Sequence, residues 1–189
     1  MKPSKSPGGV RLSGGEFRGR VLAVPKGARP SEGRVREALF SIWGHRLEGA
    51  RLLDLFAGSG AVALESMGRG ALRAVAVEGN PQALETIEAN ARKLGQGLIE
   101  IRKLTLPAGL SRLAETGERF DLVFADPPYA FNAYLQLLEG IAPLLAEEGE
   151  AVVEHSARVQ LAPEAGELVR TDVRRYGEIA LTFYRRATG

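Results

Sequence analysis

Residues 52–63 read Leu52-Leu53-Asp54-Leu55-Phe56-Ala57-Gly58-Ser59-Gly60-Ala61-Val62-Ala63, and this stretch decides the fold. Its first part is apolar like a buried strand, and its last part begins a helix. Glycines at 58 and 60 allow a tight turn between the two and let the backbone approach a ligand closely. We therefore expect a strand, a glycine turn and a helix of the kind that binds a cofactor.

Strands and helices alternate from this stretch onward. We expect strands over residues 51–56, 73–78, 98–102, 120–125 and 150–154, and helices over 61–68, 81–94, 107–115 and 132–145. Such alternation predicts a parallel sheet covered by helices on both faces. Two strands over 168–176 and 179–185 predict a hairpin, so at least one edge strand is antiparallel. The predicted fold class is α/β, a doubly wound sandwich.

The N-terminal part has a different pattern and carries much of the positive charge. Short strands over 10–13 and 17–24 flank Gly14-Gly15, and a helix capped by Ser31 runs through Trp43. We divide the chain into a basic extension over 1–45 and a second domain over 46–189. The basic residues before position 37 are Lys2, Lys5, Arg11, Arg18, Arg20, Lys26, Arg29, Arg34 and Arg36. The same stretch contains only two acidic residues, both glutamates. This excess of positive charge favours a polyanion partner over a surface that is merely solvated.

The composition of the 189-residue chain excludes several classes of function. It holds no cysteine, so disulfides, thiolate metal sites and cysteine nucleophiles are ruled out. The basic start has no apolar stretch behind it and is not a signal peptide, and no segment is apolar over the length of a membrane span. No clustered ligand set predicts a metal. We expect a cytoplasmic protein.

Two acidic residues indicate which cofactor the glycine turn holds. Glu78 ends the next strand at the spacing of a ribose-binding acid. Asp54 would repel the pyrophosphate of a dinucleotide but suits the ammonium group of S-adenosylmethionine, which we therefore prefer to NAD; the alternative is a structural acid that caps the turn. The predicted cofactor contacts are Asp54, Phe56, Gly58, Ser59, Gly60, Glu78 and Asn80.

A second motif, Asp126-Pro127-Pro128-Tyr129, follows the apolar run 120–125. Two consecutive prolines stiffen the exit from this strand. An exocyclic base amine could donate to Asp126 and to the Pro127 carbonyl while the base stacks on Tyr129. Because ligands of open α/β sheets bind beyond the carboxyl ends of the strands, one crevice can hold Asp54, Glu78 and Asp126.

These motifs resemble class I S-adenosylmethionine-dependent methyltransferases that act on exocyclic amines. The N-terminal stretches 14–20, 29–31 and 34–40 narrow the resemblance to the RsmD-type bacterial 16S rRNA guanine-N2 methyltransferase family. The resemblance implies a seven-stranded sandwich and methylation of one guanine in a ribosomal particle or assembly intermediate. Residues 101–106 lack the acid or amide that such enzymes often place near adenine, so backbone groups or Thr105 would read it.

The corresponding mechanism is direct attack of the guanine amine on the sulfonium methyl. Asp126 and the Pro127 carbonyl would stabilise the charge that develops on nitrogen. No metal is required, and His155 is not needed as a base. We expect a monomer that contacts 16S rRNA in the small (30S) subunit and no membrane. The predicted phosphate contacts are Arg18, Arg20, Arg29, Arg34 and Arg36.

Four other functions stay open at this point. An adenine-N6 DNA or RNA methyltransferase could use the same tetrapeptide, although the chain has little room for a target-recognition domain. A protein-glutamine methyltransferase fits less well, because Asp126 stands where an amide is expected. An NAD-dependent oxidoreductase leaves residues 126–129 unexplained. The fourth alternative is an RNA-binding assembly factor that retains the fold but does not catalyse methyl transfer.

Overall fold

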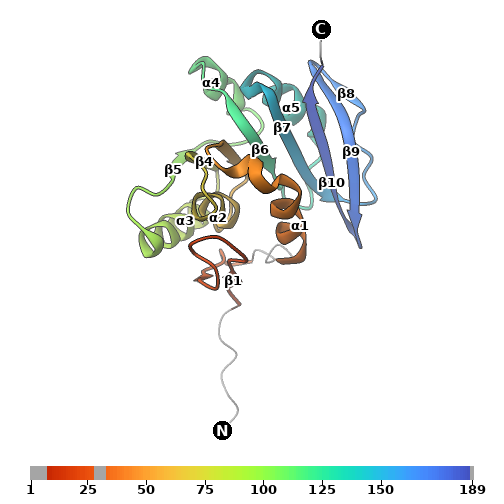
Figure 1. Cartoon of the computed structure of the whole chain (residues 1–189). Helices are drawn as coiled ribbons and strands as arrows, with labels where there is room; N and C mark the ends of the chain where they lie inside the picture. Colours follow the sequence, from red (N-terminus) through yellow and green to blue (C-terminus); the bar gives the residue numbers. More distant parts are fainter. Residues whose placement is uncertain (1–7, 28–32, 188–189) are drawn as a thin grey trace.

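The computed structural model describes residues 8–27 and 33–187. Its centre is an eight-stranded sheet with the strand order β5-β4-β3-β6-β7-β10-β9-β8 (Figure 1). The strands are β3 (Arg51–Leu55), β4 (Arg73–Glu78), β5 (Glu100–Lys103), β6 (Phe120–Ala125), β7 (Leu145–Ser156), β8 (Glu164–Ala165), β9 (Leu168–Tyr176) and β10 (Ile179–Arg186). β5, β4, β3, β6 and β7 are parallel, whereas β10, β9 and β8 pair antiparallel.

Helices cover both faces of this sheet, as Figure 1 shows. The first face carries α1 (Gly33–Trp43), α2 (Ala61–Gly68) and α3 (Pro81–Leu94), and the second carries α4 (Leu110–Glu115) and α5 (Tyr134–Ile141). On the first face, Trp43 of α1 packs edge-on against Phe124 of β6. On the second, Ile141 of α5 is buried with Phe120 of β6. The predicted doubly wound α/β fold is confirmed.

The sheet has eight strands where seven were expected. The additional strand is β8, a two-residue segment whose Ala165 pairs with Leu168 at the start of β9. A strand this short shows no alternation that a sequence pattern could reveal. It extends the antiparallel end of the sheet and leaves the parallel part unchanged.

Several element boundaries differ from the prediction for local reasons. α5 ends at Ile141, not 145, because Pro143 cannot donate a helical hydrogen bond; a 3-10 turn over Ala142–Leu144 leads directly into β7, which begins at Leu145 instead of 150. β5 begins at Glu100 instead of 98, and α4 begins at Leu110 instead of 107. In both cases a turn comes first, because the backbone N–H of Leu98 and that of Leu110 each donate to the carbonyl three residues earlier.

The N-terminal hairpin is short and is fastened to two helices. β1 (Val10–Arg11) pairs with β2 (Val21–Leu22), so the expected strands over 10–13 and 17–24 are truncated. In the turn between the two strands, the Glu16 N–H donates to the Gly68 carbonyl at the end of α2. Val10, Leu12 and Leu22 are buried with Leu64 of α2 and Ala91 of α3.

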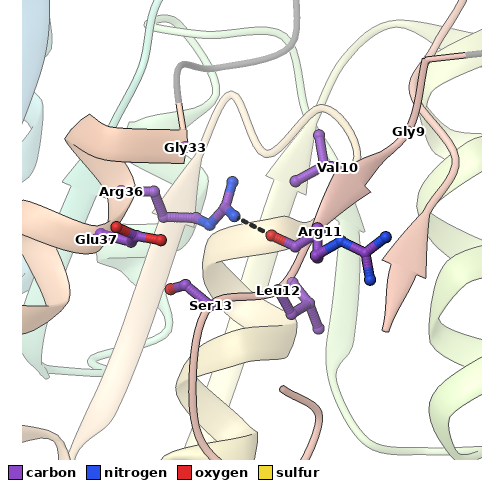
Figure 2. A pocket seen from close by; sticks show the side chains of 8 residues that line it. All are labelled: Gly9, Val10, Arg11, Leu12, Ser13, Gly33, Arg36 and Glu37. Carbon is purple, nitrogen blue, oxygen red and sulfur yellow. Dashed lines mark hydrogen bonds between the residues drawn. The ribbon is translucent and has the colours of Figure 1, made fainter. Parts of the chain in front are cut away.

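A buried carboxylate joins the hairpin to α1 and α2. Glu65 of α2 is fully buried and accepts from Arg36 Nε at 3.1 Å, from Arg69 Nη2 at 2.8 Å and from the Ser13 backbone N–H at 3.1 Å. Figure 2 shows Arg36 reaching from α1 to donate to the Arg11 carbonyl, beside a cavity of about 290 Å³. The Arg36 side chain is only 4% exposed and serves this cluster, so little of it faces solvent, and its predicted phosphate contact stays a prediction.

α1 belongs to the same apolar core as the sheet. Val35, Leu39 and Trp43 are buried in one cluster with Leu52 of β3 and Val152 of β7. The division of the chain at residue 45 stays a prediction. The Ser31 cap lies outside the described residues. Among the helices described, none combines the length and the apolar character that crossing a membrane requires.

We expect Glu65→Ala to lower the free energy of unfolding by about 3–5 kcal/mol, because it leaves two arginines without their buried partner. Urea unfolding followed by circular dichroism measures this difference. Arg158→Ala serves as the control: it removes an exposed pair with Glu178 and should cost about 1 kcal/mol or less. Equal losses in the two variants would contradict the role of the Glu65 cluster.

Candidate active site at the carboxyl ends of the strands

The strand order reverses between β3 and β6, and three predicted acids meet there. β3 pairs with β4 on one side and with β6 on the other. Asp54 lies in β3, Glu78 ends β4 and Asp126 follows β6. Asp126 and Glu78 are near enough for their charges to raise the pKa of Asp54. The three side chains therefore share the position where open α/β sheets bind ligands.

The glycine turn has the geometry that only glycine adopts easily. Gly58 and Gly60 have φ angles of 57° and 79°. A Cβ atom on Gly60 would lie 2.5 Å from Ile87 Cγ1 of α3, which is too close for any side chain. The turn thus packs tightly against α3, and its backbone is left at the strand edge for a ligand.

Glu78 organises the turn through its carboxylate. Oε2 accepts from the Gly58 backbone N–H at 2.9 Å, while Oε1 accepts from Gly79 at 2.8 Å and from Asn80 at 2.9 Å. Oε2 accepts one of these three bonds and so retains acceptor capacity for a ribose hydroxyl. The half-buried Glu78 therefore fits the ribose of S-adenosylmethionine, and its contact with the cofactor stays a prediction.

Asn80 and Ser59 have structural partners that the sequence did not indicate. The Asn80 side chain caps α3 by accepting from the Gln82 and Ala83 backbone N–H groups. The Ser59 carbonyl accepts from Asn90 Nδ2 at 2.8 Å, and the same buried amide bonds the Ala23 backbone beyond β2. Asn90 thereby connects the glycine turn to the N-terminal hairpin.

Asp54 is buried and caps the first turn of α2. Its side chain is 2% exposed, and Oδ2 accepts from the Ala63 N–H at 3.1 Å. Burial, the main cause, raises the pKa of Asp54 to about 8, and the charges of Asp126 and Glu78 raise it further. These contacts support the structural alternative for Asp54, whereas its contact with the cofactor ammonium group stays a prediction.

In the Asp-Pro-Pro-Tyr motif that follows β6, Asp126 is half-buried and the Tyr129 ring is exposed to solvent. Asp126 N–H donates to the Leu55 carbonyl at 3.3 Å, so the residue still follows β3. Pro127 is buried, whereas the Tyr129 side chain is 89% exposed. Phe131 N–H closes a turn by donating to the Pro128 carbonyl at 2.8 Å. Tyr129 thus presents an exposed ring three residues after Asp126, and the proposed roles of both residues stay predictions.

A row of aromatic rings connects the two motifs and was missed from the sequence. Phe56 has a φ angle of 59°, which costs about 1–3 kcal/mol for a residue with a side chain. Its ring meets Phe131 edge-on at 5.3 Å, and Phe131 in turn meets Tyr134 at 5.1 Å. Tyr134 lies near enough to Asp126 for that charge to add to burial in raising the pKa of its phenol. Phe131, two positions after Tyr129, gave no signal because its loop has no periodicity.

His155 is held by two hydrogen bonds at the end of β7. Nδ1 lies 2.8 Å from the Ser156 carbonyl and must donate to it, so Nε2 accepts from Thr182 Oγ1 at 2.7 Å. Burial lowers the pKa of the imidazole. Both ring nitrogens are thus engaged, which agrees with a histidine that is not used as a base.

Residues 101–106 were expected near the adenine of the cofactor. Arg102 belongs to an ion-pair network, whereas Leu104 and Thr105 lie against the turn after β4. Arg102 pairs with Glu100 and Glu118 in a network away from the turn. Leu104 and Thr105 lie directly against Gly79, where an added Cβ would be 3.0 Å from the Leu104 carbonyl oxygen. Thr105 therefore borders the turn region, and its contact with adenine stays a prediction.

The remaining arginines that were predicted to contact phosphate belong to the N-terminal part of the chain. Arg18 and Arg20 are exposed in the hairpin turn, and Arg34 is exposed on the first turn of α1. Arg20 Nη2 donates to the Lys93 carbonyl of α3. Arg29 lies outside the described residues. In the parts of the chain described, no group of three or more His, Cys, Asp or Glu side chains could hold a metal ion.

The raised pKa of Asp54 predicts a specific pH dependence of stability. Between about pH 4 and pH 8 the folded state keeps a proton that the unfolded state releases, because the pKa shifts from 3.8 to about 8. The free energy of unfolding of the wild type should therefore fall, relative to Asp54→Asn, as the pH rises through this window. Urea unfolding at pH 5, 6, 7 and 8 measures the difference.

Asp121→Asn is the matched control, since the pKa of Asp121 is lowered by Arg51 and its charge does not change in this window. Parallel curves for the wild type and Asp54→Asn would show that Asp54 is already ionised.

Comparisons with known proteins agree with this geometry. Residues 10–185 match the family described as "Conserved hypothetical protein 95". The chain is 34% identical over 196 residues to "Ribosomal RNA small subunit methyltransferase D" of Escherichia coli K12, covering 98% of this chain and 94% of the relative. The protein of that name from Haemophilus influenzae is 32% identical, covering 78% of this chain and 77% of the relative.

A solved structure, a hypothetical protein of Thermus thermophilus, is 36% identical with a TM-score of 0.81 and covers 93% of this chain and 99% of its own. The chain therefore belongs to the conserved hypothetical protein 95 family, the RsmD-type family that its motifs predicted.

Proposed function

We propose that this protein transfers a methyl group from S-adenosylmethionine to the 2-amino group of a guanine in the 16S rRNA of the small ribosomal subunit. Family membership and the names of the relatives support the broader statement that the chain is an rRNA methyltransferase. The observation that supports the finer proposal is that Asp126, the first residue of the Asp-Pro-Pro-Tyr motif, lies close enough to Asp54 for its charge, like that of Glu78, to raise the pKa of Asp54.

The residues at the strand ends have complementary roles in this reaction. S-adenosylmethionine supplies an electrophilic methyl group when it is bound. Glu78 and the glycine turn hold it by its ribose and by backbone contact. Asp126 and the Pro127 carbonyl accept hydrogen bonds from the guanine amine, orient its lone pair and stabilise the positive charge that forms on nitrogen. Tyr129 stacks on the base.

The structure offers a reason for the stiffness of this corner. Asp126 is held to β3 through its backbone, Pro127 is buried, and the turn over Pro128–Phe131 is closed by a hydrogen bond. An acceptor fixed in this way loses little entropy when the base arrives and needs no reorganisation during methyl transfer.

The deciding experiment is labelled methyl transfer to small subunits from cells that lack this enzyme, followed by identification of the methylated nucleoside. We expect N2-methylguanosine from the wild type. Asp126→Ala should lower kcat by about 100- to 1000-fold with little change in S-adenosylmethionine affinity, as measured by titration calorimetry.

Asp121→Asn, on the same strand at its other end, is the control and should keep its activity. N6-methyladenosine as the product, or no product from the wild type, would refute the guanine proposal. Full activity of Asp126→Ala would remove this residue from the mechanism.

Arg18, Arg20 and Arg34 are proposed to hold rRNA phosphates. Their combined replacement by alanine should weaken binding to small-subunit rRNA and reduce the slope of log affinity against log salt by about 2 to 3, since each phosphate contact contributes about 0.7–0.9. Filter binding between low and physiological salt measures the slope. Arg112→Ala, exposed on α4 of the opposite face, is the control. Equal slopes for the variant and the wild type would reject the phosphate role.

A further inference from the structure

β7 continues beyond the point where its neighbour β6 ends, and this brings a second acid to the base site. The last parallel pair between these strands is Ala125 with Val153. β7 stays in the sheet through Ser156, because Glu154 pairs with Leu181 of β10 and His155 pairs with Ala180. Asp126 is the first residue after β6 and is still bonded to the Leu55 carbonyl of β3, so Asp126 and Glu154 come one position beyond the last pair of two neighbouring strands, which are about 4.8 Å apart in a sheet.

The alternation of side chains places both acids on the same face. Phe124 and Val152 are paired and lie in the core cluster under α1 and α2. Glu154 comes two residues later on β7 and so points toward that face. Asp126 comes two residues after Phe124, and its backbone bond to Leu55 extends the same alternation one residue past the end of β6. Asp54 is directed there as well, since it bonds the first turn of α2. The acid of β7 thus extends the line of acids formed by β3 and β6.

Glu154 is nearly as buried as the residues of the core. Its side chain is 7% exposed, and desolvating a carboxylate costs several kcal/mol. The methyl-transfer mechanism described above does not use this residue. A buried acceptor at the carboxyl end of a strand, next to the proposed amine acceptor, has the position of a group that recognises the base.

Guanine offers donors that match two neighbouring carboxylates. Its Watson–Crick edge carries N1–H and the 2-amino group side by side, so both positions donate. Adenine presents an acceptor, N1, next to its amino group. We propose that Glu154 accepts the N1–H of the target guanine while Asp126 accepts from the 2-amino group, so that Glu154 selects guanine; this inference rests on the proposed function.

The same arrangement works against adenine. An adenine placed with its amine on Asp126 would direct the N1 lone pair at the carboxylate of Glu154, leaving two acceptors in contact. A carboxylate accepts several hydrogen bonds, so Glu154 can keep its partner within the protein and still accept the N1–H of guanine, whereas the N1 lone pair of adenine repels it. The tetrapeptide 126–129 could bind any exocyclic amine, and Glu154 on the neighbouring strand β7 would make the site specific for guanine.

The test replaces the target base and the acid together. Small subunits are reconstituted with rRNA that carries, at the mapped target position, either guanine or 2-aminopurine, which keeps the reacting amine but has an acceptor at N1. For the wild type, kcat/KM should be about 10- to 100-fold lower with 2-aminopurine, the size of one lost base contact. Glu154→Gln can offer its amide N–H to the 2-aminopurine N1, so the preference for guanine should shrink by about tenfold or more.

Glu150→Gln is the matched control, a second buried glutamate on the same face of β7, four residues earlier and opposite Leu122 of β6, where it is bound to Arg46 and Arg185. It should leave the ratio of the two substrates at the wild-type value even if it lowers stability. A loss of folding alone would change both substrates equally and would not alter this ratio.

Two results would overturn the inference. The first is wild-type enzyme that methylates guanine and 2-aminopurine equally well, a measurement that needs no variant. The second is a Glu154→Gln variant with an unchanged ratio. In either case guanine is still methylated, so the proposed function stands; absence of N2-methylguanosine from the wild type would instead refute the proposed function itself.

Discussion

The parallel pairing of β3 with β6 is the constraint on which the site depends. It sets Leu55 beside Ala125 and lets the Asp126 N–H bond the Leu55 carbonyl, so two motifs that are far apart in the chain end at one place. β4 lies on the other side of β3 and brings Glu78 to the same edge. The proposed contacts of Asp54, Glu78 and Asp126 follow from this order of strands, whereas that of Glu154 also requires β7 to pair with β6. The antiparallel strands β10, β9 and β8 complete the sheet at one end.

Two buried acids, the half-buried Glu78 and one buried amide hold the helices and turns around the site in place. Asp54 holds the start of α2, Glu65 joins α2 to α1 and the hairpin, and Glu78 shapes the glycine turn. Asn90 bonds both Ser59 and Ala23, so the cofactor turn and the basic hairpin share a partner. Since each of these groups is satisfied by backbone or charged partners, their burial is tolerated and their geometry is specific. The proposed rRNA-contacting arm is thus fastened to the same helices that frame the cofactor turn.

The aromatic residues connect the two loops in a different way. Phe56 adopts a left-handed backbone conformation in the cofactor turn, and its ring is packed against Phe131 from the loop after Asp126. Strained residues of this kind persist where surrounding contacts hold them. A change in the conformation of one loop would therefore shift the other through this ring contact. The row of rings continues from Phe131 through Tyr134 to His155 at the end of β7.

Local sequence determined the elements, the motifs and the family of this protein. The predicted bounds of α2, β4, α3, β6 and β9 agree with the structure, because periodicity, glycine and the Asn80-Pro81 cap act within a few residues. Tertiary structure alone decided which arginine is buried. Arg36 follows Arg34 with the same chemistry, yet its position on α1 directs it to Glu65 and not to solvent. Tertiary structure also decided that Glu154 stands beside Asp126, since this depends on the register of two strands and on pairing over long distances, which a linear pattern does not contain.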